Sequence, residues 1–145
     1  MKIVMQNATS LLFEKVDSLR HQHNSWRCIQ LKLSGISCRN QALRRNFVLR
    51  GIHDLLADDD GFVYVCDDQD IFILFQGRAK GILTKLATTF ADLDSDELFA
   101  LYDLHKDWAF FFAVCYRKSQ QREEELEWSK IPQVARHLAE VQPAL

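Results

Sequence analysis

Aspartates gather at two places in this sequence, Asp58-Asp59-Asp60 and Asp67-Asp68-Gln69-Asp70. Grouped carboxylates bind divalent cations or act as general acids and bases. The two groups stand at opposite ends of one predicted strand, which separates them by roughly 16 Å at about 3.3 Å per residue. One metal site cannot use both, and neither has the ligand spacing of a calcium loop. We therefore predict no metal site, and Asp67, Asp68 and Asp70 are candidate contacts for a ligand or partner.

The stretch before these aspartates, from Ser18 to His53, is basic. No Asp or Glu occurs between Ser18 and His53. The same stretch contains Arg20, Arg27, Lys32, Arg39, Arg44, Arg45 and Arg50. Such a bipolar surface suits head-to-tail association or the docking of a charged partner. The alternative, that these are solvated charges that partly pair with each other, stays open. The candidate binding residues in this stretch are Arg39, Arg44, Arg45 and Arg50.

No other combination of side chains predicts catalysis. Four cysteines occur, none of them in a CxxC pair: Cys28, Cys38, Cys66 and Cys115. A zinc site is therefore not expected, and those within apolar runs are expected to be buried thiols. His21 and His23 lack a third ligand nearby, and no Gly-rich loop or nucleophile–base grouping occurs. The sequence predicts no catalytic residue and no cofactor.

Apolar residues at helical spacing predict three helices, over residues 8–20, 40–57 and 79–93. In the second helix, the residues expected to face the core are Leu43, Phe47, Val48, Ile52, Leu55 and Leu56.

Alternating residues predict a strand from Trp26 to Ser34. Two short apolar runs, 62–66 and 71–75, enclose the acidic turn and predict a β-hairpin with Asp67–Asp70 at its tip.

The final third of the chain predicts three further elements. Asp94 or Ser95 is expected to cap a short helix that ends near Leu104. The aromatic run Trp108–Tyr116 is expected to be a buried strand. Residues 120–141 are expected to be helical, with a break near Pro132.

The central order is strand, helix, strand, strand, helix, strand. This order predicts an α+β protein with a ferredoxin-like (βαββαβ) antiparallel sheet, helices on one face, and flanking N- and C-terminal helices. The 145 residues fit one domain with a core over about 26–118, and the chain is compatible with being the N-terminal part of a longer protein. No signal peptide is evident, and the longest apolar run is about half of a membrane span. We expect no membrane contact and a cytoplasmic location.

The order of elements and the acidic hairpin tip resemble the diguanylate cyclase (GGDEF) domain family over about residues 26–116. The resembling parts are the strand Arg27–Leu33, the helix Leu43–Leu56 and the hairpin Phe62–Phe75. In that family the tip carries the signature motif. Here the same place reads Asp67-Asp68-Gln69-Asp70-Ile71, or the same run shifted by one residue to end at Phe72.

Departures from the family pattern imply a change of function. The tip has no glycine, although the family's glycines let the backbone approach a guanine nucleotide. Family cyclases also hold divalent cations with an acidic residue at the end of the first strand, where this chain reads Lys32-Leu33-Ser34-Gly35. Without metal ions nothing neutralises the triphosphate during phosphoryl transfer. The resemblance therefore implies a degenerate, catalytically silent member.

The leading hypothesis is a non-enzymatic regulatory or protein-interaction module, whose terminal helices mediate self-association or contact with a protein partner. The alternative is a nucleotide- or RNA-binding domain that uses the sheet and the basic helix over 39–50. The net charge of -2 and the lack of an RNP-type pattern argue against nucleic acid. A nucleotide ligand stays open.

Overall fold

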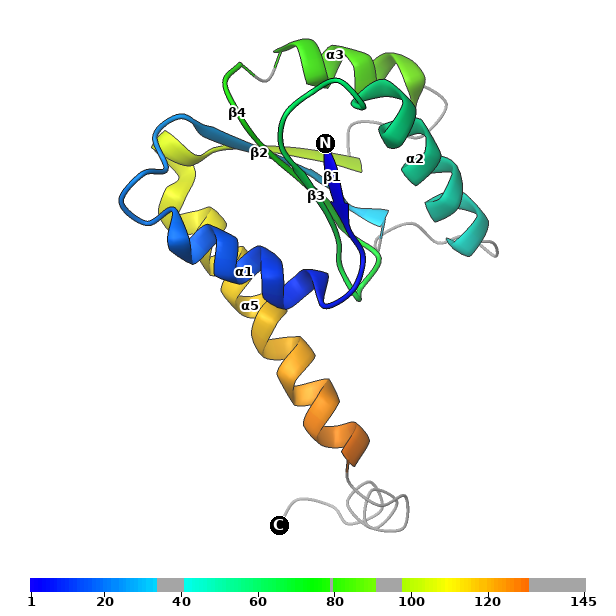
Figure 1. Cartoon of the computed structure of the whole chain (residues 1–145). Coiled ribbons are helices and arrows are strands. Elements are labelled where there is room, and N and C mark those ends of the chain that lie inside the picture. The colour runs from blue at the N-terminus through cyan, green and yellow to red at the C-terminus, as the bar shows by residue number, and fades with distance from the viewer. Residues whose placement is uncertain (34–40, 79, 91–97, 131–145) are drawn as a thin grey trace.

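The computed structural model describes residues 1–33, 41–78, 80–90 and 98–130. These residues form an α+β protein with a five-stranded mixed sheet and four helices, as Figure 1 shows. The strands are β1 (Lys2–Val4), β2 (Trp26–Leu31), β3 (Phe62–Val65), β4 (Ile71–Gln76) and β5 (Phe99–Asp103). The helices are α1 (Ala8–Ser18), α2 (Gln41–Leu55), α3 (Lys80–Thr89) and α5 (Leu104–Lys130).

The strand order is β1-β3-β4-β2-β5. Strand β1 pairs with β3 in parallel, whereas every other neighbouring pair is antiparallel. The prediction of a wholly antiparallel sheet is therefore wrong, and the order with β1 included differs from that of a simple ferredoxin fold. Strand β1 was not predicted because its three residues are too few to show an alternating pattern. It is held at its start by Lys2, whose backbone N–H donates to the carbonyl of Gly61 at 3.0 Å.

Helices cover both faces of the sheet. One face packs against α2 and α3 through Ile29, Ile73 and their neighbours, while the other packs against α1 and α5 through residues such as Phe72 and Leu74 (Figure 1). Strands β2, β3 and β4 therefore carry apolar residues on both sides, as strands buried on two faces do. The core is two apolar layers separated by the sheet.

Two predictions near the end of the chain differ from the structure. Residues Trp108–Tyr116 lie within α5 and not in a strand. Their aromatic side chains are distributed around a helix that faces the sheet, α1 and solvent in turn, so no helical period is visible in the sequence. The last strand is instead β5, so the predicted short helix does not extend to Leu104. Its predicted start at Asp94 or Ser95 lies outside the described residues.

Among its described side chains, the inward face of α2 differs from its prediction at Phe47, and the side chain of Leu43 lies outside the described residues. Val48, Ile52 and Leu56 are buried as expected, but the Phe47 side chain is 60% exposed. Its ring lies edge-on to the ring of Phe90, which directly follows α3, with 6.1 Å between ring centroids. Phe47 therefore belongs to the solvent side of α2.

The helices predicted over 8–20, 40–57 and 79–93 and the hairpin are confirmed with small changes in their bounds. The helix predicted from residue 120 begins earlier, at Leu104, and its predicted break near Pro132 lies outside the described residues. Within the described part of the chain, no helix combines the length and the apolar character needed to cross a bilayer.

Candidate functional site

The acidic tip connects β3 to β4 in a tight turn. Val65 pairs with Ile71 at the end of the ladder, and the Cys66 N–H donates to the carbonyl of Asp70 at 2.9 Å. Gln69 has a φ of 79°, in the left-handed region that favours glycine. The predicted hairpin tip is therefore present, and it carries side chains at every position.

The carboxylates of the tip face a lysine from α5. Lys118 Nζ donates to Oδ2 of Asp70 at 3.0 Å and also donates to Oδ2 of Asp68. The side chains of Asp70 and Lys118 are 4% and 14% exposed, so this pair is largely removed from water. Burial alone would lower the pKa of the Lys118 ammonium, but the hydrogen bond to Asp68 and the charge of Asp70 outweigh it and raise that pKa above its ordinary value.

A buried hydrogen-bond chain continues from Asp70 across the sheet. Gln30 on β2 donates from Nε2 to Oδ2 of Asp70 at 2.9 Å, and Tyr102 on β5 donates from its hydroxyl to Oε1 of Gln30 at 2.8 Å. Each polar group thereby has a partner inside an otherwise apolar layer. The chain joins β5, β2, the hairpin tip and α5, and we call Tyr102, Gln30, Asp70 and Lys118 the buried polar network.

The third tip aspartate pairs with an arginine one helical turn beyond Lys118. Arg122 Nε lies 2.5 Å from Oδ2 of Asp67 as an ion pair, without the alignment of a hydrogen bond. Its two terminal nitrogens donate to Ser10 Oγ and Asn7 Oδ1, each at 2.9 Å. Because Asn7 and Ser10 lie at the start of α1, Arg122 ties the tip to both helices of this face.

The predicted site residues separate into three groups. Asp67, Asp68 and Asp70 come together at the tip, and Arg45 joins them, because its Nη1 donates to Oε1 of Gln69 at 3.1 Å. Arg50 is exposed on α2 and takes no part in the tip. Arg39 and the side chain of Arg44 lie outside the described part of the structure.

The space beside the tip is small. The hollow lined by Asp67, Asp68, Lys118, Arg122 and their neighbours has a volume of about 30 Å³, which is about the volume of one water molecule. Within the described residues, no three His, Cys, Asp or Glu side chains are placed to hold a metal ion. The described geometry of this site is that of an internal electrostatic contact between a hairpin and two helices.

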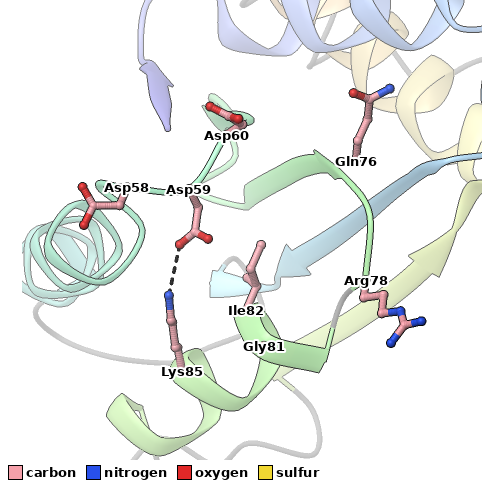
Figure 2. Close-up of a pocket in the computed structure, with 8 residues that line it drawn as sticks. All are labelled: Asp58, Asp59, Asp60, Gln76, Arg78, Gly81, Ile82 and Lys85. Carbon is pink, nitrogen blue, oxygen red and sulfur yellow. Dashed lines mark hydrogen bonds and ion pairs between the residues drawn. The ribbon is translucent and has the colours of Figure 1, made fainter.

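A larger hollow, of about 370 Å³, lies at the other end of β3. Figure 2 shows Asp59 and Lys85 directed toward each other, while Asp58, Asp60 and Arg78 point elsewhere. Lys85 Nζ is 3.2 Å from Oδ2 of Asp59. The charged groups around this open hollow do not converge on one point.

Three thiols lie under α1 and α5, near the buried polar network. Burial raises the pKa of Cys66 to about 12 and raises those of Cys28 and Cys115 above their ordinary value. A thiol so held is protonated at neutral pH and is a poor nucleophile. These cysteines are core residues, as the sequence predicts.

No protein-family model, curated protein or solved structure matches this chain. The description of the site therefore depends on the geometry of this chain alone. Sequence reasoning found its acids but missed Lys118, Arg122, Gln30 and Tyr102. Two features of the sequence could have indicated them. Gln30 is a polar residue among the apolar residues of a strand, and Lys118 and Arg122 are cations four residues apart on a helix.

Proposed function

We propose that this chain is a non-enzymatic regulatory or protein-interaction module with a cyclase-like core. The observation that carries the proposal is the pairing of the tip carboxylates with Lys118 and Arg122 of the same chain. A cyclase of the resembling family would need acidic side chains here to hold metal ions. In this chain the tip carboxylates instead attach α1 and α5 to the sheet.

The connection of the elements supports a ferredoxin-like core. Strands β3, β4, β2 and β5 are neighbours in that order and all pairs are antiparallel, with α2 joining β2 to β3 and α3 lying between β4 and β5 in the chain. Both helices lie on one face, as a split βαβ arrangement requires. On this reading β1 is an added edge strand, and α1 and α5 are additions that cover the second face.

The chemistry of the tip supports catalytic silence. Phosphoryl transfer requires cations that neutralise the phosphate oxygens, and carboxylates must be free to bind them. Asp70 and Asp68 instead share the ammonium of Lys118, and the tip has no glycine, whereas the family signature has two. A bound nucleotide would have to displace these contacts.

A nucleotide- or RNA-binding domain is the second candidate, and burial of the sheet argues against it. RNA-recognition sheets stack bases on exposed aromatic side chains. Here Phe72 and Tyr102 lie beneath α5, each with its ring beside Phe111. The binding surface on this reading would then be the basic helix α2.

The proposal is tested by incubating the full chain with GTP and Mg²⁺ or Mn²⁺ and separating the products by chromatography. We expect no cyclic dinucleotide, and its formation would contradict the proposal. Calorimetry with GTP, a cyclic dinucleotide and a short RNA tests the second candidate. A binding signal that the double variant Arg44→Ala and Arg45→Ala abolishes would establish that candidate instead.

A further inference from the structure

The outer part of α5 leaves the surface of the domain. Figure 1 shows this helix continuing past α1 and away from the sheet. Cys115 and Ser119 are buried and Arg122 is half-buried, but every residue from Glu123 to Glu127 is exposed. A helical segment without a buried side gains little from tertiary packing and is only marginally stable by itself.

This exposed part, Glu123–Glu127, is strongly acidic, and we call it the acidic segment. It contains Glu123, Glu124, Glu125 and Glu127 around the single apolar residue Leu126. Glu123 and Glu127 are four residues apart on one side of the helix, where like charges repel by about 0.2–0.5 kcal/mol. Within the described part of the structure, none of these glutamates forms an ion pair. A cationic surface would relieve this repulsion.

The complementary surface is the solvent side of α2. Of the three arginines on α2, Arg45 is already engaged with Gln69 at the tip, and Asp54 is the one acidic residue of the helix. Phe47 is 60% exposed, and Arg50, one turn further along, is exposed and forms no ion pair within the described residues. A large exposed ring beside an arginine is typical of the residues that carry binding energy at protein interfaces.

The acidic segment and the solvent side of α2 lie apart within one molecule. Helix α2 packs on one face of the sheet and α5 on the other, and the acidic segment extends away from the sheet on its own side (Figure 1). Contact between them requires two copies. Two copies can make this contact twice, across a two-fold axis, or repeat it head to tail and so build rings or open chains.

We propose that the acidic segment of one copy docks on Phe47 and Arg50 of a second copy. The inference rests on the proposed interaction function and names its partner, a second copy of this chain. Charge attraction orients the two helices, and the Phe47 ring is covered on contact. Raised salt should weaken the association, because surface charges are screened over about 3 Å at 1 M ionic strength.

The test is sedimentation equilibrium of the full chain over a range of concentrations, at low salt and at 1 M salt. Two reversed-charge variants are compared, Arg50→Glu on α2 and the double variant Glu123→Lys and Glu127→Lys on α5. Glu14→Lys, on an exposed position of α1, is the control for a change of net charge. Circular dichroism verifies that each variant is folded.

We expect concentration-dependent association of the natural chain at low salt and its loss at 1 M salt. Each reversed-charge variant alone should associate at least about tenfold more weakly, whereas Glu14→Lys should associate like the natural chain. An equimolar mixture of the two variants should recover the association, because it restores both opposite-charge contacts. A chain that is monomeric at every concentration would overturn the inference, as would reversed-charge variants that associate normally. Neither result would concern GTP turnover, which tests the proposed function separately.

Discussion

Lys118 on α5 and Asp70 at the start of β4 are 48 residues apart in the chain, yet Lys118 Nζ donates to Oδ2 of Asp70 at 3.0 Å. This contact determines how the acidic tip is used. An acidic turn at the end of a hairpin suggests a ligand site, but its most buried carboxylate already has a cation from the same molecule. The tip is therefore best understood as the place where the second helical layer is attached to the sheet.

Replacing Lys118 with methionine should destabilise the fold by about 3 kcal/mol, because it removes the cation from a buried charge pair. The measurement is the free energy of unfolding in urea. Lys106→Met, on an exposed turn of the same helix, is the matched control and should change stability by less than about 0.5 kcal/mol. Equal effects of the two substitutions would show that the buried pair contributes nothing.

Replacing Tyr102 with phenylalanine should cost about 1–2 kcal/mol, because Oε1 of buried Gln30 loses its donor while the ring remains. Tyr116→Phe, at an exposed position on α5, should be close to neutral. Urea unfolding of both variants checks this prediction. A neutral Tyr102→Phe would mean that the buried polar network does not extend to β5.

Stability should fall as the pH rises above 9. Burial raises the pKa of Cys66 from 9.0 to about 12 and that of Tyr64 from 10.0 to about 12. In the unfolded chain these two side chains lose their protons at their ordinary pKa values, whereas in the folded chain they keep them to higher pH. The protonated side chains therefore stabilise the fold fully at pH values below their unfolded-state pKa. Between that pKa and about pH 12, the free energy of unfolding declines by about 1.4 kcal/mol per pH unit for each group. The raised pKa of Lys118 acts in the same direction.

Urea unfolding at pH values from 7 to 11 measures this decline. In Cys66→Ala the decline between pH 10 and 11 should be shallower by nearly one proton, or about 1.3 kcal/mol per pH unit. Stability that is constant or rises through this range would contradict the assignment of these groups to the core.

The three described cysteines should resist a thiol reagent in the native protein. A Cys38→Ser variant leaves only Cys28, Cys66 and Cys115, all of them buried. Dithionitrobenzoate at pH 8 should label these thiols only after unfolding in urea, because the reactive form is the thiolate. Rapid labelling without denaturant would show that α1 and α5 open readily from the sheet.

Regular periodicity explains which elements could be predicted. Helices α1, α2 and α3 and the hairpin have clear spacing of apolar residues. The run Trp108–Tyr116 does not, because nearly every position is apolar and the length suits a buried strand as well as a helix. The helix is formed because it can cover Phe72 and Tyr102 on the sheet while also packing on α1.

The candidate site could be predicted only in part, for a similar reason. A cluster such as Asp67–Asp70 is visible in the sequence, because its members are neighbours in the chain. Lys118 and Arg122 come close to these aspartates only after α5 packs onto the sheet. The local spacing of residues in the sequence does not predict that contact. The three carboxylates at the tip could thus be predicted from the sequence, but their ion pairs with Lys118 and Arg122 could not.

Titration of the ¹⁵N-labelled chain with Mn²⁺ and GTP, followed by amide spectra, tests most directly whether the tip is a structural contact or a ligand site. A paramagnetic ion bound to Asp67, Asp68 or Asp70 would broaden the amide signals of residues 67–71 before all others. We predict no selective broadening at the tip at equimolar Mn²⁺ and GTP. Selective loss of those signals, reversed by a chelator, would contradict the account.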